Sequence, residues 1–355
     1  LKRCCGESLS GAASAMSAGP ALLTAASAPS YVAERLSRLE LASFVADAEL
    51  SAEEIHGGNL NYTFRVGDSH GHSVFLKQAP GFIKAFGPEA TLHRERSELE
   101  VSVYAEWVSA LGAEAAAQFL PRILDFNAET MAIIMEYLGD YKLFDESLFK
   151  GVTDERVDSA VGEFMALAHT STHCAKVGAV EAGRLTEAYR NAKLRELQLE
   201  YVFTKAFREA ELAAALREDG AFMAELEALK ATYRGEDTEN LSLLHGDLHA
   251  GSVMVDLAKG AVKIIDPEFA IYGPPGLDMG SMLSGYVMAY VTQKAIGRDD
   301  GANQLRVSME RVWTAYASGM EGSGTDPVVL ARIGEDAAGF AACEVARTAL
   351  GFAGL

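Results

Sequence analysis

The sequence is poor in cysteine and in basic residues, and both shortages narrow what the protein can be. Its 355 residues include four cysteines, whose spacing fits neither a zinc site nor a disulfide framework. Lysine and arginine total 31 against 50 acidic residues, so the formal net charge is −19. Nucleic acids and anionic membranes require a basic footprint, so this charge argues against both as partners. Free thiols fit a reducing, cytoplasmic location best.

Long apolar stretches are also missing, because no run of about 18 apolar residues suggests a membrane span. Hydrophobic residues nevertheless make up 49% of the chain, which is enough for a large core and for two lobes. Residues 1–30 differ from the rest, since they are rich in Ala, Ser and Gly and contain one acid, Glu7. Two interpretations of this segment stay open, a disordered tail and the remnant of an organelle transit peptide, and we favour disorder.

Residues 243–270 carry the strongest chemical signal. Asp247 lies on a predicted loop between His245 and His249, and an apolar hairpin follows. The second strand is predicted to carry Asp266 and Glu268 at alternate positions, so both carboxylates would point to the same side. Phosphoryl transfer from a nucleotide requires an acid that orients the acceptor hydroxyl and hard oxygen ligands that hold Mg²⁺. An acid at the end of an apolar strand is unusual without a partner or ion, which favours this interpretation over unrelated surface acids.

Residues 55–79 are predicted to form a glycine turn and a strand pair. Gly57 and Gly58 precede the first strand, Asn59 and Asn61 lie at its entry, and Lys77 lies on the second strand. Such glycines let backbone N–H groups approach phosphate oxygens, and Lys77 would add a positive charge there. Taken alone this signal is weak, because a Gly-Gly pair is usually only a turn and a strand lysine usually faces solvent.

A predicted helix over residues 92–111 carries three acids, Glu95, Glu98 and Glu100, in its first half. One of them could pair with Lys77, and we choose Glu98; a solvated acidic face is the alternative.

A buried strand over residues 130–138 then leads into a glycine. In a two-lobed nucleotide enzyme this is the hinge. The backbone of Glu136, Tyr137 and Leu138 would there contact the adenine edge.

Beyond residue 155 the apolar spacing is mostly helical, and it predicts helices over residues 157–174, 185–217, 221–233, 277–296, 304–320 and 327–350. We therefore expect an α+β fold with two lobes. Residues 31–138 would form a small antiparallel-sheet lobe with a leading helix, and residues 139–355 a larger helical lobe with the catalytic loop.

The motifs together resemble the 5-methylthioribose kinase family, part of the protein-kinase-like superfamily that also contains choline and aminoglycoside kinases. His-Gly-Asp-Leu-His at 245–249 is common to the superfamily. More specific are Gly251-Ser252, where choline and aminoglycoside kinases usually have Asn, and the similar Asp-x-Glu region at 265–280. Gly-Asn-Leu-Asn at 58–61 resembles the family's glycine loop, and the resemblance extends from about residue 47 to the C-terminus.

The resemblance implies an ATP- and Mg²⁺-dependent kinase that phosphorylates the 1-hydroxyl of 5-methylthioribose in methionine salvage. In this interpretation Asp247 accepts the hydroxyl proton, Ser252 positions the loop or a metal-bound water, and Arg347 contacts the sugar or the transferred phosphate. The chain departs from the family pattern at Thr348, where a second arginine is usual, and at Ala250, where threonine is usual.

Two alternatives stay open. A choline or aminoglycoside kinase of the same fold would suit the acidic charge. A nucleotide-binding pseudokinase would require a replaced catalytic position, and Lys77, Asp247, Asp266 and Glu268 are all present. The oligomeric state is open as well, including a homodimer.

Overall fold

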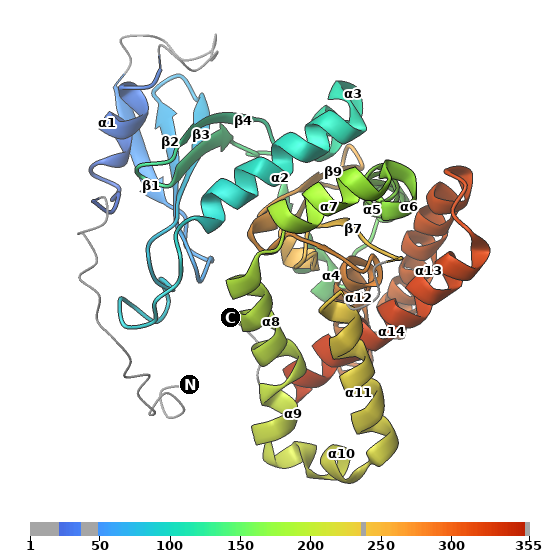
Figure 1. Ribbon diagram of the computed structural model, residues 1–355. Helices are drawn as coiled ribbons and strands as arrows, with labels where there is room; N and C mark the ends of the chain where they lie inside the picture. The colour runs from blue at the N-terminus through green and yellow to red at the C-terminus, as the bar shows by residue number, and fades with distance from the viewer. Residues whose placement is uncertain (1–20, 37–48, 236–238, 352–355) are drawn as a thin grey trace.

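The computed structural model describes residues 21–36, 49–235 and 239–351, and Figure 1 shows a small sheet-containing part beside a larger helical part. The strands are β1 (Leu50–Glu54), β2 (Tyr62–Asp68), β3 (Ser73–Gln78), β4 (Ile123–Asn127), β5 (Ala132–Glu136), β6 (Lys142–Leu143), β7 (Ser242–Leu244), β8 (Val253–Asp256), β9 (Ala261–Ile264) and β10 (Ile271–Gly273). The predicted α+β class is confirmed, whereas the lobe boundary at residues 138 and 139 stays a prediction.

The first five strands form one antiparallel sheet in the order β1-β2-β3-β5-β4. Alternation of side chains explains its two faces, because residues two apart in a strand point to the same side. Val74 and Leu76 of β3 are fully buried and pack in one apolar cluster with Ala28 and Val32. Lys77 therefore projects from the opposite face of the sheet.

The N-terminal segment differs from its prediction. Residues 1–20 and 37–48 lie outside the described residues, so disorder of residues 1–20 stays a prediction. Residues 21–30 were expected to be disordered, yet they include the first half of helix α1 (Ala28–Ala33), which lies beside β1 and β2 (Figure 1). The Leu23 N–H donates to Gln78 Oε1 at 2.7 Å, and Leu23 and Val32 are buried against the sheet. Burial of these apolar side chains explains why the segment is ordered.

Two helices lie between β3 and β4, namely α2 (Arg96–Leu111) and α3 (Ala113–Phe119). The α-helices that follow β5 are α4 (Phe144–Phe149), α5 (Glu155–Thr172), α6 (Cys174–Val177), α7 (Ala179–Ala188), α8 (Ala192–Phe203), α9 (Lys205–Glu209), α10 (Ala214–Glu218), α11 (Gly220–Tyr233), α12 (Gly276–Ala295), α13 (Asp299–Gly322) and α14 (Pro327–Ala349). The single helix predicted over residues 185–217 is wrong. Four helices cover most of this region, and Asn191 interrupts it with left-handed backbone (φ 40°). Within the described residues, no helix is both long and apolar enough to cross a membrane.

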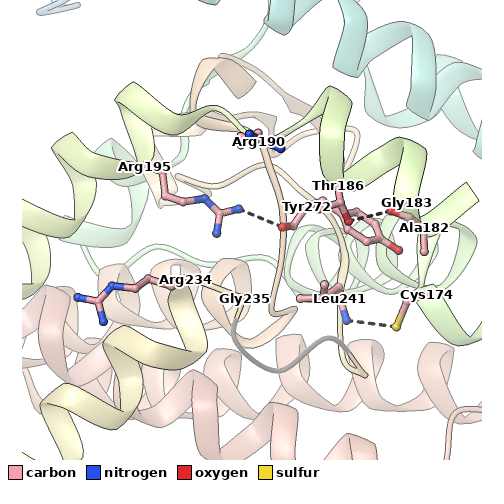
Figure 2. A pocket seen from close by; sticks show the side chains of 10 residues that line it. All are labelled: Cys174, Ala182, Gly183, Thr186, Arg190, Arg195, Arg234, Gly235, Leu241 and Tyr272. Carbon is pink, nitrogen blue, oxygen red and sulfur yellow. Dashed lines mark hydrogen bonds between the residues drawn. The ribbon is translucent and has the colours of Figure 1, made fainter. Parts of the chain in front are cut away.

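A cavity of about 350 Å³ opens in the helical part between α7, α8 and the β7 and β10 strand pair (Figure 2). Three arginines and Cys174 are among its lining residues, and none of the residues predicted to bind nucleotide or metal is.

Candidate active site

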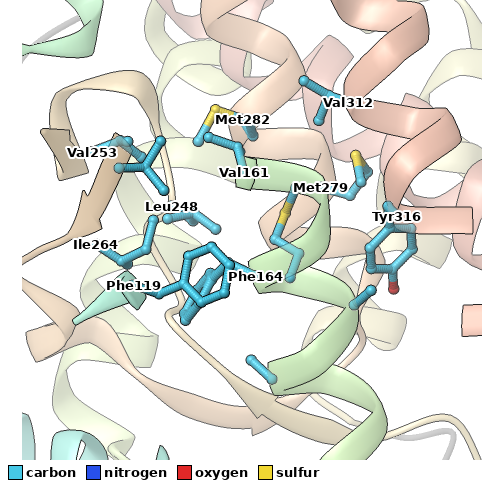
Figure 3. Packing of buried hydrophobic residues seen from close by; sticks show 14 of the residues in the cluster. Phe119, Val161, Phe164, Leu248, Val253, Ile264, Met279, Met282, Val312 and Tyr316 are labelled. Atoms are coloured by element: carbon cyan, nitrogen blue, oxygen red, sulfur yellow. The ribbon is translucent and has the colours of Figure 1, made fainter. Parts of the chain in front are cut away.

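Asp247 lies on the loop after β7, and the hydrophobic core holds this loop in position. Leu248 is fully buried and packs in the cluster that contains Phe164 of α5 and Met279 and Met282 of α12 (Figure 3). The neighbouring Asp247 side chain remains 29% exposed. An apolar anchor next to a partly exposed acid is the arrangement that a positioned catalytic carboxylate requires.

Asp278 at the start of α12 holds the backbone of this loop. One of its carboxylate oxygens accepts the His245 N–H at 2.8 Å, and the other accepts the Gly246 N–H at 2.9 Å. His169 Nε2 lies 3.3 Å from the same carboxylate, so this histidine belongs to the same buried hydrogen-bond network. Sequence reasoning missed Asp278, whose charge is compensated here by the two amides and His169.

The loop lies directly against the segment that carries Asp266. Gly246 has a φ of 83°, and a Cβ there would lie 2.0 Å from the carbonyl oxygen of Phe269, so only glycine permits this approach. His245 Nε2 lies 2.9 Å from the Ile265 carbonyl oxygen, and the Ser252 hydroxyl donates to the Asp247 carbonyl at 3.0 Å. The two predicted motifs are therefore joined by backbone contacts, and Ser252 stabilises the loop.

Asp266 differs in conformation from its prediction. It has left-handed backbone (φ 68°), and a 3₁₀ turn over Pro267–Phe269 follows it, so the expected strand ends at Ile264 of β9. Its carboxylate forms an ion pair with the Lys77 ammonium and is 48% exposed. Burial alone would raise the pKa of Asp266, but Lys77 outweighs that effect and holds the pKa below its usual value.

Lys77 pairs with Glu100 of α2, and the choice of Glu98 is wrong. Lys77 Nζ lies 2.6 Å from Glu100 Oε2, with the two side chains 5% and 1% exposed. Glu98 is exposed to solvent. The reason is helical periodicity. Arg96, Glu100 and Tyr104 are spaced four residues apart and therefore lie on the buried face of α2, whereas Glu98 lies outside that face. Burial raises the pKa of Glu100, and Lys77 opposes this shift.

Glu268 is almost fully buried and lies at the centre of a network that sequence reasoning missed. Asn61 Nδ2 donates to both Glu268 oxygens at 3.1 and 3.2 Å, and Arg96 Nε donates to Oε2 at 3.1 Å. The other Arg96 N–H groups bond to the carbonyl oxygens of Pro80, His93 and Leu60 and to Asn61 Oδ1. Burial raises the pKa of Glu268, while Lys77 opposes the shift and Asp266 adds to it.

Three carboxylates could hold a metal ion. Glu100, Asp266 and Glu268 each offer an oxygen, and the three oxygens lie within 4.8 Å of one another. An all-carboxylate set of hard ligands fits Mg²⁺ rather than a softer metal. Asp266 is the exposed member of the group, so it is the ligand that an incoming ion can reach from solvent.

The remaining predicted nucleotide residues lie in two places, the loop before β2 and the segment at the end of β5. Gly57, Gly58 and Asn59 are exposed in the loop between β1 and β2, and a Cβ added at either glycine would meet nothing within 4 Å. Tyr137 and Leu138 follow β5. Among the backbone hydrogen bonds of the described residues outside helices and strands, none uses the Leu138 N–H. The Glu136 side chain faces Lys263, with 3.4 Å between Oε1 and Nζ.

Arg347 lies near the end of α14 and pairs with Glu344 on the same helix, with 2.6 Å between Nε and Oε2. Burial raises the pKa of Glu344, and the charges of Arg347, Asp247 and His249 also act on it. Asp247 is thus among the charges that act on Glu344, while the contact of Arg347 with substrate stays a prediction.

The sequence is similar to those of known phosphotransferases. A model of the family described as "Phosphotransferase enzyme family" matches residues 51–313. The methylthioribose kinase of Exiguobacterium sibiricum is 28% identical over 345 residues, which cover 91% of this chain and 85% of the relative. The methylthioribose kinase of Geobacillus kaustophilus is 28% identical over 340 residues, covering 89% of this chain and 82% of the relative. These relatives confirm the likeness expected from the motifs.

Solved structures show the same fold at lower sequence identity. An ethanolamine kinase of Plasmodium vivax superposes with a TM-score of 0.51 at 13% identity, covering 90% of this chain and 80% of the other. A glucosamine kinase in complex with glucosamine, ADP and inorganic phosphate gives a TM-score of 0.50 at 16% identity, covering 92% and 84%. Both likenesses support the two-part kinase-like architecture. Since the family model matches most of the sequence, including the Asp247 loop and the Asp266 segment, the chain belongs to the phosphotransferase enzyme family.

Proposed function

We propose that this protein is a kinase that transfers the γ-phosphoryl group of ATP to the 1-hydroxyl of 5-methylthioribose. Phosphoryl transfer is supported by the contact of the Asp247 loop with the Asp266 segment at Gly246, beside the buried Lys77–Glu100 pair. The choice of 5-methylthioribose as the substrate is supported by the similarity, over about nine tenths of the chain, to relatives named methylthioribose kinase.

Each predicted site residue has its own role in phosphoryl transfer. Asp247 orients the acceptor hydroxyl and takes its proton at the carboxylate. Lys77 contacts the phosphates and is itself positioned by Glu100, while the Gly57–Gly58 turn and Asn59 supply backbone N–H groups. The free Leu138 N–H supports the assignment of residues 136–138 to the adenine edge. Positioning and charge neutralisation then supply most of the rate.

Mg²⁺ is the metal that the carboxylate set fits. Asp266 and Glu268 would hold it, and the ion would neutralise phosphate charge while transfer occurs. Asn61 and Arg96 keep Glu268 in place through direct hydrogen bonds, so their role is positioning.

A second acceptor class has its own supporting observation. Glu344 is a buried acid coupled electrostatically to the Asp247 loop, and Thr348 stands beside Arg347 in place of a second arginine. A cationic acceptor such as choline or an aminoglycoside would be attracted to such an acid. Arg347, which already neutralises Glu344, would repel it, and this favours the neutral sugar.

An ATP-consumption assay tests the proposal with 5-methylthioribose, choline and kanamycin measured side by side. We expect the highest kcat/KM with 5-methylthioribose. Asp247→Asn should lower kcat by roughly 10²–10⁴, as expected for loss of a positioned general base, with little change in KM for ATP. The exposed Asp300→Asn is the matched control and should keep wild-type kinetics. Faster turnover of choline or kanamycin would reject the substrate assignment, and full activity of Asp247→Asn would reject the mechanism.

A further inference from the structure

Helix α8 presents a row of hydrogen-bond donors to the segments that form the candidate active site. Asn191 at its N-terminal boundary, Arg195 and Gln198 are spaced four and three residues apart, so they lie on one face of the helix. Each of these three side chains donates to backbone carbonyl oxygens outside the helix. The acceptors belong to the Asp247 loop, the Asp266 segment and their immediate surroundings.

Gln198 holds the peptide group from which Asp247 projects. Its Nε2 donates to the Gly246 carbonyl oxygen at 2.7 Å, and this carbonyl shares one planar peptide with the Asp247 N–H. Because a carbonyl oxygen only accepts, the Gln198 amide has a single orientation, and its Oε1 accepts from the Tyr233 hydroxyl at 2.8 Å. Burial raises the pKa of Tyr233, so this hydroxyl stays protonated and can donate. Gln198 and Tyr233 are both buried, so water does not compete for these hydrogen bonds.

Asn191 holds the Asp266 segment. Its Nδ2 donates to the carbonyl oxygens of Glu268 and Ala270 at 3.0 and 3.1 Å. The Phe269 carbonyl oxygen between them is the one that the catalytic loop approaches closely. One helix therefore holds both sides of the contact between the two segments.

Arg195 fixes the strand pair that is continuous with these segments. Its Nη2 donates to the Tyr272 carbonyl oxygen of β10 at 3.0 Å (Figure 2). Tyr272 pairs with Leu243 of β7, and β7 leads into the catalytic loop. The Arg195 Nη1 donates to the carbonyl oxygen of Tyr233 at 2.9 Å, which attaches the end of α11 to α8.

We propose that Asn191 and Gln198 are positioning residues, through which α8 sets the Asp247 loop in register with the Asp266 segment. This role rests on the proposed function, in which Asp247 orients the acceptor hydroxyl toward a phosphate held beside Asp266 and Glu268. The rate of such a transfer depends on the relative placement of the two segments, and a displacement of about 1 Å can lower it about 10²-fold.

Two substitutions remove the donors while sparing the backbone. Gln198→Met keeps the length of the side chain, and we expect kcat to fall about 10- to 100-fold with KM for ATP within about 3-fold of wild type. Asn191→Gly suits the left-handed backbone at this position (φ 40°), so it removes the amide without strain, and kcat should fall about 10-fold. The exposed Glu196→Gln on the same helix is the matched control and should keep wild-type kinetics.

Amide hydrogen exchange followed by mass spectrometry gives a readout that requires neither substrate nor metal. We expect a peptide covering residues 243–249 to exchange about 10-fold faster in Gln198→Met, and a peptide covering residues 266–272 about 10-fold faster in Asn191→Gly. Exchange in α5 should stay at the wild-type rate in both variants. If Gln198→Met does not fold, Tyr233→Phe keeps the buried ring but releases the Gln198 amide, and exchange in the catalytic loop should again increase.

A purely stabilising role for these contacts predicts a different result. A lower melting temperature, with kcat per folded enzyme and loop exchange both at wild-type values, would overturn the proposal for the residue concerned. Unchanged loop exchange in Tyr233→Phe would overturn it where Gln198→Met cannot be measured. Kinetics are measured with whichever acceptor the wild type uses best, and hydrogen exchange uses none, so an error in the proposed substrate is distinguishable from failure here.

Discussion

Replacement of Glu100 by glutamine tests the ion pair that the structure assigns to Lys77. The substitution keeps the size of the side chain and leaves an acceptor for the ammonium, but it removes the negative charge. The remaining hydrogen bond from the ammonium is still charge-assisted, but the attraction between opposite charges is lost, so we expect the Lys77 contact to weaken by about 1–2 kcal/mol, within the range of hydrogen bonds to charged groups. This corresponds to roughly a 10-fold change.

Glu100→Gln should lower the activity of the enzyme more than the stability of its fold. Glu100 is 1% exposed, and burial of its charge is unfavourable, as the raised pKa of the carboxyl reflects. A neutral glutamine does not carry that desolvation cost, which offsets part of the weaker contact. We therefore expect the free energy of unfolding to change by no more than about 1 kcal/mol, while kcat/KM for ATP falls about 10-fold.

Glu98→Gln is the matched control on the same helix, two residues away and exposed. It should leave both quantities unchanged, since exposed substitutions usually fall within about 0.5 kcal/mol. Urea unfolding and steady-state kinetics at varied ATP measure the two effects in parallel. The assignment of Glu100 is refuted if Glu98→Gln impairs ATP use more than Glu100→Gln does, or if Glu100→Gln has wild-type kinetics.

Two glycines at close contacts give further predictions. Gly246→Ala should lower kcat by about 10² or more, because its Cβ would lie 2.0 Å from the Phe269 oxygen and displace the catalytic loop; wild-type kinetics would refute this. Gly162→Ala should lower stability by about 1–3 kcal/mol in calorimetry, because its Cβ would lie 2.4 Å from the Val312 oxygen where α5 packs on α13. Gly322→Ala meets nothing within 4 Å and should stabilise α13 slightly, so equal effects of the two substitutions would contradict the packing argument.

The sequence predicted the features that depend on short-range periodicity. Strand alternation located β2 and β3 and placed Lys77 on the second of them, and the apolar run before Glu136 identified β5. Asp247 between two histidines marked the catalytic loop, and the structure adds the reason for Gly246, since the Cβ of any other residue would lie 2.0 Å from a carbonyl oxygen. These patterns repeat every two to four residues or occupy a single position, and they can be recognised without knowledge of distant contacts.

The errors arose where a distant contact decides between equal local patterns. Glu98 and Glu100 look alike as acids on one predicted helix, and the buried stripe that contains Val103, Tyr104 and Trp107 is what separates them. This signal was present in the sequence and could have been used. By contrast, nothing local predicts the left-handed conformation of Asp266, which non-glycine residues rarely adopt.

Arg96 shows why the metal site could be predicted only in part. Its guanidinium uses all five N–H groups, and they connect the glycine loop at Leu60 and Asn61, the segment after β3 at Pro80, and Glu268. Without this cation, the Glu268 charge would be buried close to Asp266 and would be strongly unfavourable. The paired acids of the sequence can therefore coexist only because a residue far away in the chain neutralises one of them. The other acid, Asp266, is compensated by its ion pair with Lys77, which is also far from it in the chain.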